Sequence, residues 1–404
     1  MHKKYAAVDV CIVGAGPVGG TLACRLAAGG VKVAVVDRAA LPPMEHPDFD
    51  GRAYAVASGS RRLLEAAGLW EHLPQVPCPI LDIRVSDGRV GRPASRMFLH
   101  FDHEEAGEEA RPFGWMVEAR ALRVALNAQI HAQPDLIVHA PAEATVTRTV
   151  AGAVVQVVGG PEIHAQLVVA AEGRQSLLRE QAGIRVTRLP YDQRGIVSAV
   201  AHEKPHHNTA LEHFLPAGPF AQLPMTGTDG APNVSAIVWT ERTEQADRVI
   251  ALDDVAFARE VQRRLGSHLG AVRLIGRRWI YPLGALHAER YVDTRLVLVG
   301  DAAHGIHPIA GQGLNLGFRD VIALSDLLIG AVSAGQDLGA PALLQAYQRA
   351  RRPANLMMLG ATDVLDRLFS SNNPLLRLAR DIGIAGVHRT PALKRAFMRQ
   401  AMGG

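Results

Sequence analysis

The chain has 404 residues, of which 48% are hydrophobic, and its 43 basic and 39 acidic side chains give a formal net charge of +4. This length exceeds one typical hydrophobic core, so we expect two domains. The charges are spread along the sequence without the Lys/Arg blocks of nucleic-acid-binding proteins, which argues against a nucleic-acid partner. Three cysteines, Cys11, Cys24 and Cys78, suit buried thiols and imply neither a disulfide framework nor a metal site.

The two ends of the chain bear on its location. The amino-terminal stretch shows no signal-peptide cleavage pattern, and no apolar run approaches the ~20 residues of a membrane-spanning helix. We therefore expect a cytoplasmic protein. From residue 341 onward, apolar residues recur every three or four positions among Arg and Lys, which predicts helices. Such helices suit a solvated surface, and also the face of an anionic membrane or of a partner protein.

The segment VDVCIVGAGPVGGTLACRLAAGGVKVAVVD, residues 8–37, reads as strand, glycine turn, helix and strand. Gly14, Gly16 and Gly19 have the G-x-G-x-x-G spacing. The first permits a tight turn, the second lets a pyrophosphate reach the backbone, and the third lets helix and strand pack closely. Asp37 ends the second strand, where a carboxylate accepts hydrogen bonds from ribose hydroxyls. These parts predict a dinucleotide site without choosing between NAD and FAD.

A second glycine-rich loop lies far along the chain, in LVLVGDAAHGIHPIAGQGLNLGFRD at residues 296–320. Its glycines at 311, 313 and 317 suggest that a ligand approaches the backbone there. A nicotinamide cofactor needs no second loop, whereas an extended FAD needs one for its ribityl chain and isoalloxazine. Asp301 would accept from ribityl hydroxyls, Pro308 would lie beside the ring, and the following helix would direct N–H groups to the ring edge. The expected FAD contacts here are Asp301, Gly311, Gly313, Leu314 and Asn315.

These motifs resemble those of the group A flavoprotein monooxygenases, and within them the ubiquinone-biosynthesis aromatic hydroxylases. The matching segments are VGAGPVGG at 13–20, DGRAYAVASGS at 50–60, FGWMVEARALRVAL at 113–126, FLPAGPFAQLPM at 214–225 and GDAAHGIHPIAGQGLNLGFRD at 300–320. The last segment is the most specific, because its proline and GQGLN continuation belong to the hydroxylase branch.

The resemblance implies an FAD-dependent enzyme that hydroxylates the aromatic ring of a polyprenylated phenol in ubiquinone biosynthesis. In this family NAD(P)H reduces FAD, O₂ adds to the flavin as a C4a-hydroperoxide, and one oxygen passes to the ring. Pro308 and His304 are the candidate catalytic residues, and Arg52 is expected near the FAD pyrophosphate or the ring. Two alternatives stay open. One is a flavin dehydrogenase or reductase of the same fold that does not use O₂, and the other is a non-catalytic FAD-binding member of a biosynthetic complex.

Three positions depart from the family pattern. An Asp-Gly pair usually follows the strand that ends near residue 171, but here Glu172 takes the place of the Asp. Glu172 keeps the negative charge on a longer side chain, so the contact to the nicotinamide cofactor stays open. Ala119 stands where Asn is common, so one side-chain contact to the cofactor is expected to be lost. Asp37 replaces the commoner Glu, which is a milder change.

The expected fold class is α/β, with a discontinuous, Rossmann-like FAD-binding domain of glutathione-reductase type, an inserted α+β substrate domain and C-terminal helices. The first domain must be discontinuous because its two cofactor loops lie near opposite ends of the chain. We assign it residues 1–75, 110–180 and 278–345, with 76–109 and 181–277 as the substrate domain and 346–404 as the helical region. Four segments, GIVSAVAH, EHFLPA, FAQLPM and NVSAIVWT, read as strands of one substrate sheet.

Several polar residues have more than one interpretation. His304 and His307 are three apart, but no third ligand type lies nearby, so no metal is expected. For His304, a structural hydrogen bond beside Asp301 is the first interpretation and proton handling the alternative. Tyr191 and Gln193 open the substrate sheet, where packing and pocket lining fit equally well. No catalytic base, and no particular ring carbon, follows from the sequence.

Overall fold

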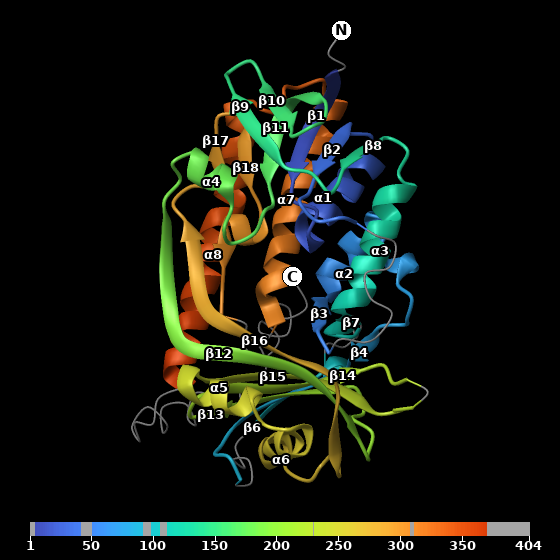
Figure 1. Cartoon of the computed structure of the whole chain (residues 1–404), viewed down its shortest axis with the longest axis vertical. Coiled ribbons are helices and arrows are strands. Elements are labelled where there is room, and N and C mark those ends of the chain that lie inside the picture. The colour runs from blue at the N-terminus through green and yellow to red at the C-terminus, as the bar shows by residue number, and fades with distance from the viewer. Residues whose placement is uncertain are drawn as a thin grey trace.

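The computed structural model describes residues 5–41, 51–91, 98–105, 111–228, 230–307 and 311–369. Two large sheets lie one above the other, with helices beside the upper sheet and beneath the lower one (Figure 1). Two long strands, β12 (Val186–His202) and β16 (Val272–Ala288), extend from the second sheet up toward the first. The predicted α/β class is confirmed.

The first sheet has its strands β18, β11, β1, β2 and β8 in parallel. Its members are β1 (Tyr5–Val13), β2 (Val33–Val36), β8 (Leu136–His139), β9 (Ala144–Arg148), β10 (Ala153–Val157), β11 (Glu162–Ala170), β17 (Val292–Asp293) and β18 (Leu296–Leu298). The central strands are almost wholly buried, as expected for a parallel sheet covered on both faces. The chain order reverses between β1 and β11, which is where sheets of this kind bind ligands at their carboxyl ends.

Helices pack around this sheet and confirm the predicted strand–helix–strand unit at the amino terminus. α1 (Pro17–Ala28) joins β1 to β2 and packs against α7 (Gln312–Ser333) and α3 (Ala119–Ala132). The remaining elements near this sheet are α2 (Ser58–Ala66), α4 (Leu177–Gln181) and the 3₁₀ turns η1 (Trp70–His72) and η3 (Gly300–Ala302). A small sheet, β3 (Ala53–Ala57), β7 (Gly114–Glu118) and β4 (Cys78–Ile80), lies beside them.

The second sheet has the order β19-β16-β12-β15-β14-β13-β5-β6. Its further strands are β5 (Asp82–Asp87), β6 (Phe98–Asp102), β13 (Thr209–Leu215), β14 (Gly218–Met225), β15 (Val234–Arg242) and β19 (His304–Gly305). All four predicted strand segments lie in it, so their shared sheet is confirmed. β16 passes through residue 278 without a break, so the expected boundary there falls inside one strand.

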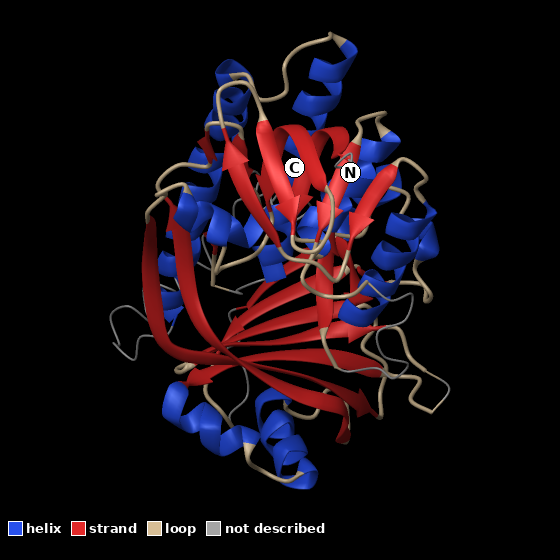
Figure 2. Ribbon diagram, turned by 45° about the horizontal axis from the view of Figure 1, so that its top comes forward, coloured by secondary structure: helices blue, strands red, loops and turns tan. Residues whose placement is uncertain are grey.

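Helices cover the second sheet on the face turned away from the first. α5 (Thr243–Ile250) and α6 (Asp254–Leu265) lie beneath it (Figure 2), where Trp239, Phe220 and Phe257 form a buried cluster. α8 (Pro341–Phe369) runs beside β12 and β16, which confirms the predicted helix as far as residue 369. Residues 370–404 lie outside the described part. Within the described ranges, no helix combines the length and apolar character needed to cross a bilayer.

Candidate functional site

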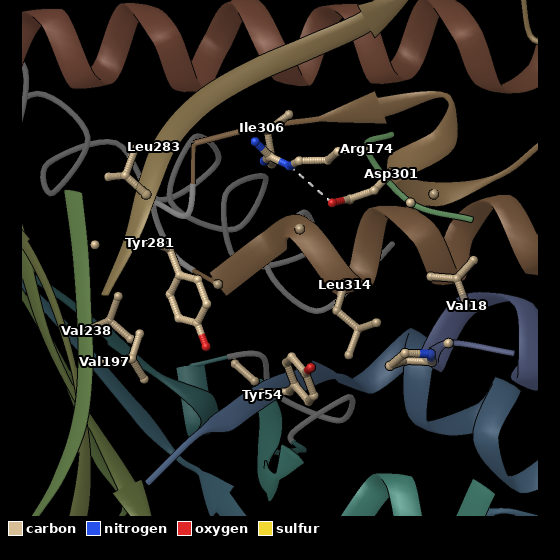
Figure 3. A pocket seen from close by; sticks show the side chains of 18 of the residues that line it. Val18, Tyr54, Arg174, Val197, Val238, Tyr281, Leu283, Asp301, Ile306 and Leu314 are labelled. Atoms are coloured by element: carbon tan, nitrogen blue, oxygen red, sulfur yellow. Dashed lines mark hydrogen bonds and ion pairs between the residues drawn. The ribbon is translucent and has the colours of Figure 1, made fainter. Parts of the chain in front are cut away.

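A cavity of about 1420 Å³ lies between the two sheets. One end, the polar end, is formed by the loops that follow β1, β2, β11 and β18, and includes Gly16, Asp37 and Asp301. The other, the apolar end, is formed by the second sheet, with Val197 and Val238 among its lining residues. Figure 3 shows Asp301 and these two valines on opposite sides of the cavity. The polar end coincides with the reversal of strand order, so a ligand is expected there.

The three glycines of the first turn have different structural roles. Gly14 has a φ of +105°, and a Cβ on it would lie 2.4 Å from the carbonyl oxygen of Ala171. A Cβ on Gly19 would lie 2.0 Å from the carbonyl oxygen of Gly14. A Cβ on Gly16 would meet no described atom within 4 Å, and Gly16 lines the cavity. The predicted tight turn and close packing are therefore confirmed, and the space at Gly16 is open to a ligand.

Side chains from two elements hold this turn in place. Asp37 Oδ2 accepts a hydrogen bond from the backbone N–H of Ala15 at 2.5 Å, and its Oδ1 accepts from Ala39 N–H at 2.7 Å. Arg123, on α3, donates to the Ala15 carbonyl oxygen at 2.7 Å. Asp37 thus closes the turn as well as lining the cavity. Arg123 was not singled out from the sequence, although it lies in one of the matching segments.

The glycines of the second loop have two different roles: some leave space for a ligand, and one allows two helices to pack closely. Gly311 adopts a φ of +63° as the residue before α7, and a Cβ on Gly313 would meet no described atom within 4 Å. A Cβ on Gly317, by contrast, would lie 2.6 Å from Cγ2 of Val18. The prediction that a ligand approaches all three glycines is therefore wrong for Gly317, which lets α7 pack closely on α1.

Leu314 and Asn315 lie in the first turn of α7 and face different surroundings. Leu314 lines the cavity beside Gly313 (Figure 3). Asn315 is buried, and its side-chain oxygen accepts from Ala57 N–H at 2.9 Å and from the Ser60 hydroxyl at 2.8 Å. Its amide group donates to the Ala55 carbonyl oxygen at 2.8 Å. The Asn315 side chain therefore ties the loop to β3 and α2, and only its backbone is left for a cofactor.

Asp301 projects into the polar end from η3 and has a partner that the sequence did not reveal. Its Oδ2 accepts a hydrogen bond from Nε of Arg174 at 3.2 Å (Figure 3). Arg174 also donates to the Gly284 carbonyl oxygen on β16 at 3.0 Å. Both charged side chains are about half exposed, at 50% and 44%, so they are accessible to a ligand in the cavity. This pair joins three segments that are distant in sequence.

His304 belongs to a buried polar network behind the loop. Its Nε2 lies 2.5 Å from Oδ2 of Asp320, which also accepts from Gly300 N–H at 3.0 Å. Oδ1 of Asp320 accepts from Arg351 Nε at 2.8 Å and from the Asn355 amide at 3.1 Å. Burial alone would raise the pKa of Asp320, but His304 and Arg351 outweigh it and hold that pKa below its ordinary value.

This network identifies the hydrogen-bond partner of His304. The sequence predicted a structural hydrogen bond beside Asp301, and the structure shows that its partner is Asp320. His304 is buried and is not among the residues that line the cavity. The geometry therefore favours a structural role that fixes the Gly300 turn. Pro308, the other catalytic candidate, lies outside the described residues.

Three further positions from the sequence analysis, Arg52, Glu172 and Ala119, have different surroundings. The Arg52 guanidinium stacks 4.3 Å from the ring centre of Trp279. Glu172 accepts from the Ser176 hydroxyl at 2.6 Å and from Leu178 N–H at 3.2 Å, so it holds the start of α4 while lining the polar end. Ala119 is the first residue of α3 and is buried.

Tyr191 and Gln193 bind α8 and do not line the cavity. The Tyr191 hydroxyl donates to Asp363 at 3.0 Å, and the Gln193 amide donates to Asp366 at 3.3 Å. Gln193 also contacts His307, with 3.3 Å between its Oε1 and the ring Nε2. Of the two interpretations left open by the sequence, the structure supports packing. Among the described residues, no group of three His, Cys, Asp or Glu side chains is placed to hold a metal ion.

The residues at the polar end fit FAD. Gly16 and Gly313 leave open space at two points of one cavity, next to the starts of α1 and α7. A helix start offers free N–H groups and a partial positive charge, which suit a pyrophosphate and an electron-rich ring edge. Asp37 and Asp301 place carboxylates at the same end of the cavity for sugar and ribityl hydroxyls.

Comparisons with known proteins agree with this fit. Residues 7–361 match the FAD binding domain family. Ubiquinone hydroxylase UbiL of Rhodospirillum rubrum is 48% identical over 396 residues, which cover 98% of this chain and 89% of that protein. The 3-demethoxyubiquinol 3-hydroxylase of Escherichia coli K12 is 32% identical, with 98% of each chain covered.

Solved structures share the fold. PqsL of Pseudomonas aeruginosa in complex with 2-aminobenzoylacetate has a TM-score of 0.75 at 23% identity, covering 95% of this chain and 100% of that one. The p-nitrophenol 4-monooxygenase PnpA of Pseudomonas putida has a TM-score of 0.75 at 17% identity, with 99% of each chain covered. The chain belongs to the FAD binding domain family and is an FAD-dependent aromatic hydroxylase that uses NAD(P)H.

Proposed function

We propose that this enzyme hydroxylates the aromatic ring of a polyprenylated phenol in ubiquinone biosynthesis, with O₂ as the oxygen source. The observation that carries the proposal is one continuous cavity that joins the open backbone at Gly16 and Gly313 to the apolar sheet face. The names of the two relatives described above support a quinone-pathway ring as the substrate. The ring carbon and the prenyl chain length are left open.

The polar end supplies the groups that would hold FAD. The turn at Gly14, Gly16 and Gly19 would receive the pyrophosphate, and Asp37 the ribose. Asp301 would accept from the ribityl hydroxyls, and the backbone from Gly311 to Asn315, through Gly313 and Leu314, would meet the ring edge. For Arg52 we propose a cationic contact near the cofactor, and for Pro308 a position beside the reacting carbon. We propose that His304 acts indirectly, through Asp320.

FAD bound at the polar end, with NAD(P)H as reductant, would supply the redox chemistry that activates O₂, one of whose oxygen atoms enters the ring. The protein must orient the ring and keep water away, because water diverts the oxygen to hydrogen peroxide. Valine, leucine and phenylalanine side chains at the apolar end suit that task, among them Val85, Val197, Val238, Leu223 and Phe214.

A prenyl tail sets a requirement beyond the ring. Leu365 and Leu368, near the end of α8, line the cavity and would contact an apolar chain. On the same helix Met357 and Val364 are 71% and 63% exposed. These exposed apolar side chains support our proposal that a cytoplasmic enzyme meets the inner membrane surface or a biosynthetic complex. We also propose the division into FAD-binding, substrate and C-terminal helical regions, with β12 and β16 connecting the first two.

The test is to delete the gene in its own host and profile quinone intermediates by mass spectrometry. Build-up of one under-hydroxylated prenylphenol, reversed by the wild-type gene, is expected and would identify the ring carbon. Normal ubiquinone with no accumulated precursor, in a host without a second hydroxylase of this kind, would overturn the proposal. A change in another redox metabolite would instead support a flavin dehydrogenase or reductase.

A further inference from the structure

Glu212 occupies an unusual position at the apolar end of the cavity. It lies on β13, between Ala210 and Phe214 on the strand face that lines the cavity. Across the sheet its neighbours in register are Val85 on β5 and Ala221 on β14, which line the cavity too. A carboxylate therefore stands in the middle of a mostly apolar sheet face.

The other charged residues of the cavity wall are gathered at the opposite end. They follow the carboxyl ends of the first sheet's strands and are Asp37, Arg38, Glu143, Glu172, Arg174 and Asp301. The second sheet contributes Glu212 as its charged lining residue, together with the polar side chains of Thr240 and Tyr281. A ring held between the start of α7 and this sheet would thus meet one carboxylate on the sheet side.

Nothing in the described part of the chain satisfies this carboxylate. The Glu212 side chain makes no hydrogen bond or ion pair with any described residue. It is only partly buried, and its exposed surface faces the cavity that it lines. Most Asp and Glu side chains in a protein interior are paired, so an unpaired one that faces a cavity suggests a ligand with a proton to donate.

The surroundings also shift its protonation. Burial among apolar side chains raises the pKa of Glu212 to about 7. Asp87 lies two residues beyond Val85 on β5, opposite Phe214, and β14 carries no ionisable side chain from Gly218 to Met225. His213 projects from the other face of β13, where it contacts Ser86 at 2.8 Å. α8 presents Leu365 and Leu368 to the cavity.

We propose that Glu212 accepts the hydroxyl proton of the phenol substrate and so activates its ring for oxygen transfer. This inference rests on the proposed function. The phenol O–H bond breaks and the proton passes to the carboxylate while a C–O bond forms at the ring with an oxygen atom from O₂. The ring carbon then loses its hydrogen as a proton, and the phenol oxygen regains one. NAD(P)H supplies two electrons as a hydride and the solvent supplies one proton, the bond between the two oxygen atoms breaks, and the second oxygen atom leaves as water.

Two variants separate proton transfer from simple binding. Glu212→Gln keeps a hydrogen-bond acceptor of the same size but takes up no proton, and Glu212→Leu removes both properties. The matched control is Glu244→Gln, an exposed glutamate on α5 behind the same sheet. Each holoenzyme is tested with 2-geranylphenol for product formation between pH 6 and 9, and for binding by the change in flavin absorbance. The methyl ether of the same compound serves as a ligand without the hydroxyl proton.

The wild-type rate of hydroxylation should rise as pH increases through about 7, because the carboxylate must be ionised to accept the proton. Glu212→Gln should be at least ~100-fold slower at pH 8 and lose that rise, yet still bind the phenol. Glu212→Leu should lose roughly tenfold in phenol affinity with little change for the ether. Glu244→Gln should match the wild type.

A wild-type rate and pH profile in Glu212→Gln would overturn the inference while leaving the proposed function intact. If the wild type forms no hydroxylated product, the proposed function fails, but the binding measurements still decide the role of Glu212. In that case, equal affinity of the wild type and Glu212→Leu for the phenol at pH 8 would overturn it. A loss of affinity for the phenol but not for the ether in Glu212→Leu would support it.

Discussion

At the polar end of the cavity the protein presents backbone, with open space at Gly16 and Gly313, whereas at the apolar end the second sheet presents side chains. The side chains near the polar end mostly hold that backbone in place: Asp37 closes the first turn, and Asn315 anchors the second loop. At the apolar end, by contrast, side chains such as Val238 and Glu212 form the cavity wall directly.

Because of this difference, substitutions at the two ends should affect different properties of the protein. A change at the polar end disturbs the path of the backbone, so it should affect folding or retention of the cofactor. A change at the apolar end alters the shape or polarity of the wall on a sheet that keeps its hydrogen bonds, so it should affect the reaction. Five substitutions test this separation.

The largest effect is expected at Asp320, which supports the polar end from behind. Asp320→Ala leaves buried His304 and Arg351 without their carboxylate, which should lower the free energy of unfolding by about 3–5 kcal/mol. Urea denaturation measures this loss of stability, and Asp326→Ala is the control. Asp326 is on the same helix, but its side chain is 63% exposed. Its replacement should lower the free energy of unfolding by under ~0.5 kcal/mol. Equal losses in the two variants would contradict the proposed role of the network.

The same substitution has a pH signature. The pKa of Asp320 is lower in the folded protein than its ordinary value, so its contribution is complete above about pH 4 and is lost as pH falls through the folded pKa. The stability difference between wild type and Asp320→Ala should therefore shrink on acidification below about pH 4. A difference that grew in acid would have the wrong sign.

The next effect compares two glycines of one turn. Gly16→Val should fold normally but lose at least ~100-fold in FAD affinity, because its side chain would fill the open space at the turn. Gly19→Val should instead destabilise the apoprotein by about 3 kcal/mol, because its Cβ meets the Gly14 carbonyl oxygen. FAD titration and urea denaturation measure the two effects. A Gly16→Val protein with full FAD would refute the role of that turn.

A smaller loss is expected from Asp301→Ala. Removing an acceptor of ribityl hydroxyls should weaken FAD binding roughly tenfold, or ~1.5 kcal/mol, since the carboxylate is half exposed. Asp247→Ala is the control, because Asp247 is another half-exposed carboxylate paired with an arginine, on α5. Equilibrium titration of apoprotein with FAD gives both values. Undiminished affinity in Asp301→Ala would show that the ribityl chain lies elsewhere.

The smallest effect is expected at the apolar end. Val238→Thr keeps the shape of the wall but adds a hydroxyl that attracts water, so a few-fold more NAD(P)H should be consumed with release of hydrogen peroxide. FAD content should not change. Val255→Thr, at a 62% exposed position on α6, is the control. A loss of FAD in Val238→Thr would contradict the claim that the apolar end affects the reaction and not cofactor binding.

The polar end could be predicted from the sequence because its signals are local. Gly14, Gly16, Gly19 and Asp37 fall within one strand–helix–strand unit, where spacing alone defines the turn. The supports of that end could not be predicted. Asp320 lies inside α7, and its partners His304 and Arg351 reach it only when the helices pack. The sequence predicted a structural hydrogen bond for His304, but for the same reason it could not identify Asp320 as the partner.

The apolar end was harder to predict in detail. The sequence predicted a strand at EHFLPA, and alternation along β13 places Ala210, Glu212 and Phe214 on one face, but periodicity does not tell which face meets a cavity. Glu212 therefore could not be recognised as a site residue, although an acid between apolar positions of a strand was a signal. Arg174 escaped notice because Asp301, its partner, is distant in sequence.

The most direct test of the central claim, that FAD at the polar end hydroxylates a ring at the apolar end, is isotope labelling. Purified holoenzyme is incubated with NAD(P)H, a short-chain 2-prenylphenol and ¹⁸O₂, and the product is examined by mass spectrometry. The account predicts a hydroxylated phenol that carries one ¹⁸O atom. NAD(P)H oxidation that yields only hydrogen peroxide, or a product whose oxygen comes from water, would contradict it.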